Sequence, residues 1–272
     1  MRAAVSVSEM SVRGGAAHRV SRVLPEEAAV AMVYDGTTQA VLMATPRDLE
    51  VFGVGFSLTE GIVARPEEIE SLEVVPQPEG IEVRMWLAAS RGAALAARRR
   101  RMAGPIGCGL CGIDSLGEAL RPLPPVPAAG IMLGHAEIAA AIAALGDWQP
   151  LHRQTGAVHA AALFVPGEGI VAAREDVGRH NALDKLVGAL AGAGLAAGDG
   201  VVILTSRVSV EMVQKSVLAG ARVLVALSAP TAHAVRLAEG AGLTLVGLAR
   251  AGGCEIFSRP DRIGGRRESD VA

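Results

Sequence analysis

The segment from Val201 to Leu248, VVILTSRVSVEMVQKSVLAGARVLVALSAPTAHAVRLAEGAGLTLVGL, decides the fold of the second half of the chain. Short, continuous apolar runs alternate in it with stretches whose apolar residues recur at helical spacing. The continuous apolar runs predict strands at 201–204, 223–226 and 244–248. The stretches with helical spacing predict helices at 210–219 and 232–241. Strands that are apolar throughout are typical of a sheet covered by helices on both faces, so the segment predicts an α/β core.

The residues before this segment extend the same pattern. We predict helices at 136–145 and 179–191, and strands at 160–165 and 170–173, joined by a turn at 166–169. The stretch 121–130 contains four prolines and cannot hold regular hydrogen-bonded structure, so it is a connector. We therefore place the α/β core at residues 131–258 and expect a flexible tail at residues 259–272.

The first part of the chain has a different organisation. Two apolar runs meet around Asp35 and Gly36, which predicts a β-hairpin over residues 28–44. Asp48 is a candidate cap for a helix that ends near Gly61. Further strands are predicted at 72–75 and 81–87 and a helix at 93–101, which gives a smaller α+β subdomain over residues 28–130. We expect residues 1–27 to form a flexible tail.

Composition limits the function classes. The 272 residues carry 26 basic and 28 acidic side chains, so the overall charge gives no reason to expect nucleic acid or an acidic membrane as a partner. Three cysteines argue against a secreted disulfide framework and favour a reduced environment. Because no apolar run approaches the roughly 20 residues of a membrane span, we expect a cytoplasmic protein.

Polar clusters follow four of the predicted core strands. They are REDVGRHN, TSRVS, SAPT and ARAGG, at the points where strands give way to helices or turns. In open α/β sheets these points lie at one edge, where helix N-termini attract anions. The clusters therefore predict a crevice for phosphate-like groups, helped by the arginines that they contain. These are Arg174, Arg179, Arg207 and Arg250.

Each cluster also has a plainer interpretation. Thr205, Ser228 and Thr231 are candidates for ordinary helix caps or turn residues. Within 175–185, His180 and Asp184 stand one helical turn apart, so Asp184 is a candidate for fixing the His180 ring in an ion-paired helix start. His159 is either a functional residue of this crevice or a core histidine whose ring nitrogens are hydrogen-bonded within the protein. No Walker A or GxGxxG sequence is present, which disfavours an ordinary nucleotide-triphosphatase or Rossmann function.

Cys108 and Cys111 form a C-x-x-C sequence between glycines. Thiols at this spacing serve metal binding, disulfide exchange or the carriage of sulfur. A structural zinc site needs four ligands, and a zinc deaminase needs H-x-E before P-C-x-x-C, which this sequence lacks. The arginines at 98–101 either lower the pKa of a nearby thiol or form a solvated helix end. Cys254 has no neighbouring cysteine and is interpreted as structural.

Five segments carry a resemblance to a known family. GCGLCG, TGAVHAAALF, AREDVGRHNALDKLVG, TSRVSVEMVQK and LSAPTAHAV occur in this order and resemble the FdhD family of formate dehydrogenase accessory sulfurtransferases. The likeness runs from about Tyr34 to Phe257. It implies a cytidine-deaminase-like three-layer α/β core without the deaminase zinc, a smaller α+β N-terminal subdomain and a homodimer. It also implies cysteine desulfurase and formate dehydrogenase as partners.

The resemblance further implies that Cys108 carries sulfur as a persulfide, with Cys111 assisting, to a molybdenum bis-guanine-dinucleotide cofactor bound as substrate. No resident metal is expected. The family often has an aromatic residue where Leu248 stands and a tyrosine where Phe257 stands. The alternative is a non-catalytic chaperone that binds the guanylated cofactor. The expected cofactor contacts are Arg179, His180, Asn181, Arg207, Ser228, Thr231, Leu248, Ala249, Arg250, Ala251, Gly252 and Gly253.

Overall fold

The computed structural model describes residues 2–102 and 122–264. Its largest unit is a six-stranded sheet with the order β12-β11-β10-β9-β7-β8. Strands β9, β10 and β11 are parallel, whereas β7 is antiparallel to both β8 and β9, and β12 is antiparallel to β11. The bounds are β7 His159–Val165, β8 Gly169–Asp176, β9 Val201–Leu204, β10 Val223–Ala226, β11 Thr244–Arg250 and β12 Gly253–Ser258.

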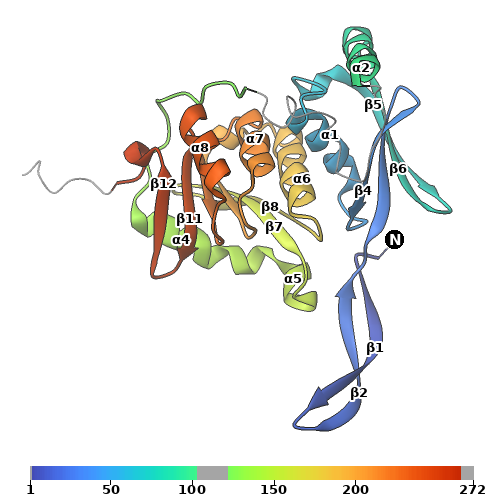
Figure 1. Cartoon of the computed structure of the whole chain (residues 1–272), viewed down its shortest axis with the longest axis vertical. Helices are drawn as coiled ribbons and strands as arrows, with labels where there is room; N and C mark the ends of the chain where they lie inside the picture. The colour runs from blue at the N-terminus through green and yellow to red at the C-terminus, as the bar shows by residue number, and fades with distance from the viewer. Residues whose placement is uncertain (1, 103–121, 265–272) are drawn as a thin grey trace, which may run out of the picture.

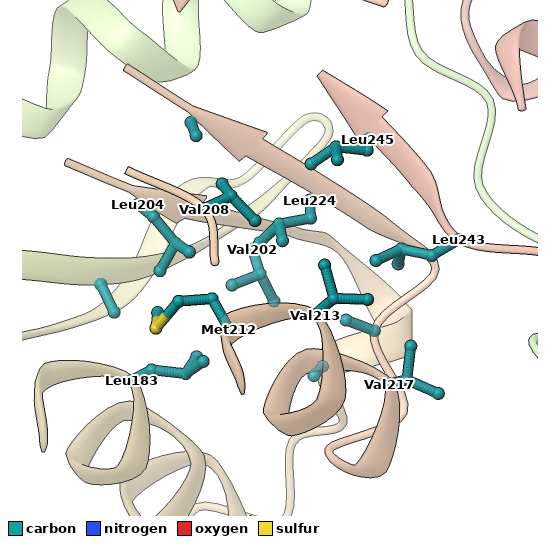
Figure 2. Close-up of a cluster of buried hydrophobic side chains, with 14 of the residues drawn as sticks. Leu183, Val202, Leu204, Val208, Met212, Val213, Val217, Leu224, Leu243 and Leu245 are labelled. Atoms are coloured by element: carbon teal, nitrogen blue, oxygen red, sulfur yellow. The ribbon is translucent and has the colours of Figure 1, made fainter. Parts of the chain in front are cut away.

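Helices cover both faces of this sheet, as the apolar strands predict (Figure 1). Helices α6 (Arg179–Gly192), α7 (Val210–Leu218) and α8 (Ala232–Ala241) lie on one face. Helix α4 (His135–Leu145) packs on the other, and the short α5 (Pro150–Thr155) follows it. Figure 2 shows the core beneath α7, where Met212 and Val213 meet Val202 and Leu224 of the sheet.

The N-terminal subdomain has its own core. A four-stranded sheet of order β4-β3-β6-β5 packs against helix α1, and helix α2 follows β6. Buried Val30 and Met32 of β3 and Val83 of β6 lie on the face of the sheet that packs against Phe52 of α1. The bounds are β3 Ala28–Tyr34, β4 Thr37–Ala44, α1 Leu49–Thr59, β5 Ile69–Gln77, β6 Gly80–Leu87 and α2 Ala89–Met102.

Both predicted tails differ from the structure. Residues expected to form a flexible N-terminal tail instead form an antiparallel hairpin, β1 (Ala4–Arg13) and β2 (Ala16–Pro25). Residues 259–264 are not a tail, because the Arg262 side chain is 1% exposed and donates to the carbonyls of Gly242 and Pro127. Those hydrogen bonds tie the connector and the end of the chain to the core. The rest of the predicted C-terminal tail, residues 265–272, lies outside the described residues.

The other differences are local. Helix α5 and the edge strand β12 were not predicted, and β11 continues beyond Leu248 to Arg250 through a bulge. Asp48 precedes α1 as predicted, but its side chain makes no capping hydrogen bond, and the residue has a left-handed backbone with φ of 57°. Its carboxylate lies 3.9 Å from Arg174 Nε instead. Across residues 2–102 and 122–264, no helix is both long and apolar enough to cross a membrane.

Candidate functional site

The four predicted polar junctions meet at one edge of the large sheet. Because β7 is antiparallel to both β8 and β9, strand β8 points the same way as β9, β10 and β11. Their carboxyl ends therefore lie at the same edge of the sheet, with β7 between β8 and β9. Backbone hydrogen bonds link successive junctions, from Leu227 N to the Leu204 carbonyl at 2.9 Å and from Leu248 N to the Ser228 carbonyl at 3.2 Å. This edge, with the starts of α6, α7 and α8, is where the sequence predicts a crevice, and it is called the crevice below.

Buried polar atoms without a hydrogen-bond partner concentrate at this edge. Within the described part of the chain there are five such side-chain atoms. Arg179 Nε and His180 Nε2 belong to the first turn of α6, and Ser209 Oγ to the residue before α7. Arg174 Nε lies near the end of β8 and has no hydrogen bond, but it forms an ion pair with Asp48 at 3.9 Å. The fifth is Arg262 Nε, in the C-terminal segment. Since buried polar groups in folded proteins are nearly always satisfied, the cluster indicates a place for a ligand.

The electrostatics of the α6 start favour an anion. Burial, reinforced by the positive charges of Arg179 and Lys215, lowers the pKa of His180 to about 4. Burial and Arg179 also lower the pKa of His159. Both imidazoles are therefore neutral near pH 7. A charged donor beside a neutral one at a helix N-terminus is a suitable environment for an oxyanion.

The junctions after β9, β10 and β11 contribute exposed groups and ordinary turn contacts. Arg207 is exposed, and Arg250 donates to the carbonyl oxygens of Leu227 and Ala249. Thr231 caps α8 by accepting from Ala234 N at 3.2 Å, so the plainer interpretation of this hydroxyl is confirmed. Thr205 Oγ1 likewise accepts from Ala160 N at 2.9 Å. Both hydroxyls accept hydrogen bonds from backbone amides and so help to fix the backbone around the crevice.

The turn from Leu248 to Gly253 lies at the same edge. Leu248 has a left-handed backbone with φ of 51°, and its side chain is 39% exposed. Such a conformation is uncommon for a residue with a β-carbon and projects this apolar side chain outward at the bulge of β11. The side chain of Ala249 is fully buried, so a cofactor contact here would be made by the backbone, and the contact stays a prediction. Ala251, Gly252 and Gly253 are exposed.

Two further residues of the 175–185 segment make hydrogen bonds at the interface between the subdomains. Asn181 was an expected cofactor contact, but it is 5% exposed and its amide donates to Met43 O and Asp176 Oδ1, each at 2.9 Å. Asp184 does not fix the His180 ring. It accepts from Thr59 Oγ1 at 2.6 Å and from Lys215 Nζ at 2.9 Å. Both side chains hold the two subdomains together.

The interface between the subdomains is built on buried charge. Lys185 Nζ lies 2.6 Å from Asp176 Oδ2, with both side chains fully buried, and donates to Thr45 O at 2.8 Å. Lys215 Nζ contacts Glu60 Oε1 at 2.7 Å as well as Asp184. Burial alone would lower the pKa of Lys215, but the two carboxylates outweigh it and raise that pKa. Sequence patterns could not predict these contacts, because their partners stand far apart in the chain.

Backbone contact completes this interface. Helices α1 and α6 cross where Gly55 faces Asp184 and Gly188 faces Val51. A β-carbon on Gly55 would lie 1.7 Å from the Asp184 carbonyl oxygen, and one on Gly188 would lie 1.8 Å from the Val51 carbonyl oxygen. Only glycine permits this approach. The N-terminal subdomain is thereby fixed on the helix whose first turn lines the crevice.

The predicted thiol pair is not part of this geometry, because Cys108 and Cys111 lie outside the described residues. The arginines at 98–101 end helix α2, and their influence on a thiol stays a prediction. Cys254 is half-buried against the α4 face of the sheet, and burial raises the pKa of its thiol. Among residues 2–102 and 122–264, no group of three His, Cys, Asp or Glu side chains is placed to hold a metal ion.

Fold and site together define an α/β protein with two closely joined subdomains and a group of unpartnered buried polar atoms at the carboxyl edge of its larger sheet. Comparison with known proteins identifies the family within this class. The model of the FdhD/NarQ family matches residues 25–264, and the chain belongs to this family. The resemblance seen in the sequence motifs is therefore confirmed.

Relatives match over nearly the whole chain. The chain is 51% identical to "Sulfur carrier protein FdhD" of Agrobacterium fabrum, with 94% of this chain and 95% of that protein covered. It is 57% identical to the protein of the same name from Brucella abortus, covering 91% and 94%. A solved structure from Desulfotalea psychrophila, named as a formate dehydrogenase accessory protein, is similar with a TM-score of 0.78 and 26% identity, covering 97% of this chain and all of that one.

Proposed function

We propose that this chain carries sulfur as a persulfide on Cys108, from a cysteine desulfurase to a molybdenum bis-guanine-dinucleotide cofactor required by formate dehydrogenase. One observation carries the proposal: relatives named sulfur carrier proteins match more than nine tenths of the chain at over half identity. The C-x-x-C pair supplies the thiol chemistry that such a role needs, inside the segment that the family model covers.

The loading step is a thiolate exchange. The Cys108 thiolate attacks the outer sulfur of the donor persulfide, forming the Cys108–S–SH persulfide after proton uptake and releasing the donor cysteine as its thiolate. No external oxidant or reductant is needed, because the sulfane sulfur keeps its oxidation state. Arginines at 98–101 would favour the thiolate form of Cys108.

Release follows one of two routes that the residues allow. In the first, the Cys111 thiol attacks the inner sulfur of the persulfide, so that a Cys108–Cys111 disulfide forms and the outer sulfur leaves as hydrogen sulfide. The two thiols are oxidised as the sulfur is reduced, so electrons balance. In the second, a reduced acceptor takes the outer sulfur directly and supplies the two electrons that reduce it, Cys108 leaves as the thiolate, and Cys111 only tunes the reactivity of Cys108.

The crevice suits the guanylated cargo. Each guanine dinucleotide brings a diphosphate, and the start of α6 offers Arg179 Nε and His180 Nε2 without protein partners. Ser209 Oγ adds a third such group at the start of α7. Exposed Arg207 and Arg250 stand at the neighbouring junctions, where a long ligand would reach them. The residues present therefore fit an elongated, strongly anionic ligand.

Intact-mass measurement tests the proposal. After incubation with a cysteine desulfurase and cysteine, we expect one added sulfur atom on the wild-type protein, located at Cys108 by peptide mapping. Cys108→Ala should lose the adduct, whereas the matched control Cys254→Ala should keep it. An unmodified wild-type protein, or an undiminished adduct in Cys108→Ala, would contradict the proposal.

The alternative is a chaperone that binds the guanylated cofactor without carrying sulfur. The unpartnered donors of the crevice favour binding of this kind, whatever the cysteines do. It predicts that Cys108→Ala still supports formate dehydrogenase activity when cofactor binding is retained. Sulfur carriage predicts that this variant binds the cofactor but leaves the dehydrogenase inactive.

A further inference from the structure

The junction between β8 and α6, residues 176–178, is held by hydrogen bonds from both subdomains. It stands directly before Arg179 and His180, whose unpartnered nitrogen atoms lie at the crevice. The residue before α6 is Gly178, which offers no side chain to cap the free N–H groups of the helix. The first turn of α6 is therefore fixed by groups outside the helix cap.

The Asp176 carboxylate fixes this turn with both of its oxygens. Its Oδ1 accepts from Gly178 N at 2.7 Å and from Asn181 Nδ2 at 2.9 Å. Its Oδ2 accepts from Thr45 N at 3.0 Å and from Lys185 Nζ at 2.6 Å. One oxygen thus orders the start of α6, while the other joins that start to the residue that follows β4.

Thr45 makes the most direct contact between the N-terminal subdomain and this junction. Its Oγ1 accepts from Val177 N at 3.1 Å, and its carbonyl oxygen accepts from Lys185 Nζ at 2.8 Å. Thr45 is fully buried, and an N–H that loses its partner in such a place is costly. Because Val177 is two residues before Arg179, a shift of its backbone moves the first turn of α6.

Asn181 ties the same turn from its other end. Its amide nitrogen donates to Met43 O at 2.9 Å, so the end of β4 bonds on both sides of the first turn. The amide fits because position 178 is glycine, where a β-carbon would lie 2.6 Å from Asn181 Nδ2. The two residues with unpartnered nitrogen atoms therefore lie between Val177 and Asn181, which are both tied to the N-terminal subdomain.

We propose that Thr45 and Asn181 are positioning residues that hold the first turn of α6 so that its unpartnered groups face a bound diphosphate. Both are buried and bonded within the protein, so they act on the ligand through Arg179 and His180. The N-terminal subdomain thereby completes a site whose ligand-facing groups belong to the other subdomain. The positioning role rests on the proposed binding of a guanylated cofactor.

Calorimetry of guanosine diphosphate binding to the full chain tests this role. Thr45→Val nearly keeps the shape of the side chain and keeps both backbone contacts, but it removes the acceptor for Val177 N. We expect the dissociation constant to rise about tenfold, the lower end of the range seen when a bound metal ion loses an outer-sphere partner. Thr45→Ser keeps the hydroxyl and should restore wild-type affinity. Asn181→Ala removes the other tie and should weaken binding to a similar extent.

Thr244→Val is the matched control for the loss of a buried hydroxyl. Thr244 is also fully buried, and its Oγ1 donates to Arg259 O at 2.7 Å and accepts from Arg262 Nη1 at 3.0 Å. It begins β11, at the edge of the sheet opposite the crevice. This variant should lose stability but keep its affinity for guanosine diphosphate. Equal weakening in Thr45→Val and Thr244→Val would show that Thr45 acts through stability alone and would contradict the proposal.

The protonation of His180 gives a readout that does not depend on ligand. Burial is the main reason that the pKa of this imidazole lies at about 4. A loosened first turn admits water, so in Thr45→Val this pKa should rise toward about 6.5, whereas Thr45→Ser and Thr244→Val should keep the wild-type value. The charged groups that act on the imidazole, none altered in these variants, are Arg179, Lys215, Glu211 and Glu60. An NMR titration, with the signal assigned by its absence in His180→Asn, measures the pKa. An unchanged value in Thr45→Val contradicts the positioning role.

Two negative results are distinguishable. If wild type binds guanosine diphosphate and Thr45→Val binds it equally well, positioning is overturned and cofactor binding stands. If wild type does not bind guanosine diphosphate, the site and its positioning fall together, and sulfur loading is judged by its own mass measurement. Persulfide formation at Cys108 should be the same in wild type, Thr45→Val and Thr244→Val.

Discussion

The subdomain interface and the crevice are built from the same short segment but use its polar groups in opposite ways. At the interface, Asp176 and Lys185 are fully buried, and each has its hydrogen bonds satisfied by partners in both subdomains. At the crevice, Arg179 and His180 keep buried nitrogen atoms without a partner. The comparison separates polar residues that hold the fold from polar residues that are available to a ligand.

The largest effect should come from breaking the interface. Lys185→Met leaves the Asp176 carboxylate buried without its cation, and we expect a loss of about 3–5 kcal/mol in the free energy of unfolding. Arg179→Ala, in the same helix, should cost no more than about 0.5 kcal/mol, because its Nε makes no bond in the fold. Urea unfolding at pH 7 measures both. Equal losses for the two variants would remove the distinction between interface and crevice.

The glycine contact predicts the next largest effect. Gly188→Ala forces a β-carbon against the backbone of α1, and we expect a loss of about 1–3 kcal/mol in unfolding free energy. Gly192→Ala is the matched control at the end of the same helix, where a β-carbon meets nothing within 4 Å. This variant should gain up to about 1 kcal/mol from helix propensity. A tolerated Gly188→Ala would mean that the two helices do not cross at this distance.

His180 predicts a pH dependence of stability. Its pKa is about 4 in the fold and near 6.5 when unfolded, so the unfolded state binds the proton more readily between these values. Stability from this residue is present above pH 6.5 and is lost as the pH falls toward 4. Relative to His180→Asn, wild type should lose about 1–2 kcal/mol more on going from pH 7 to pH 5. Parallel losses in the two proteins would show that His180 is not held neutral.

The smallest effect concerns the exposed arginines of the crevice. Arg207→Ala or Arg250→Ala should weaken guanosine diphosphate binding about fivefold, the loss of one partly solvated charged contact. Persulfide formation at Cys108 should not change. Arg236→Ala, on the exposed side of α8, is the control and should bind as wild type. Calorimetry that shows unchanged affinity in all three would take Arg207 and Arg250 out of the site.

Local patterns in the sequence predicted much of the fold. Continuous apolar runs marked β9 and β10 at their observed bounds, and the shared edge of four polar junctions followed from strand direction. The hairpin of β1 and β2 was missed because Val, Ser and Arg alternate on both of its faces, although Gly14 and Gly15 between two runs were a hairpin signal. Strand β12 was missed because GCEIFS mixes glycine and charge at an edge.

The site was predicted less completely, and distance along the chain explains why. Thr45 and Asp176 are hydrogen-bonded although 131 residues separate them, and Lys215 reaches both Thr59 and Asp184. The periodicity of residues within a short stretch of sequence cannot indicate pairs that lie so far apart in the chain. Asn181 and Asp184 were consequently assigned to ligand binding and to histidine positioning, when their partners lie in the other subdomain. Ser209 was overlooked, although it ends a polar cluster directly before a helix.

The release of sulfur from protein that already carries the Cys108 persulfide tests the central claim most directly. Wild-type protein carrying the Cys108 persulfide is mixed with the guanylated molybdenum cofactor, and its intact mass is followed over a single turnover. We predict that the added sulfur disappears, and that Arg179→Ala, loaded to the same extent, loses it more slowly. A persulfide that persists in the presence of the cofactor, or that decays equally without it, would contradict sulfur delivery by this chain.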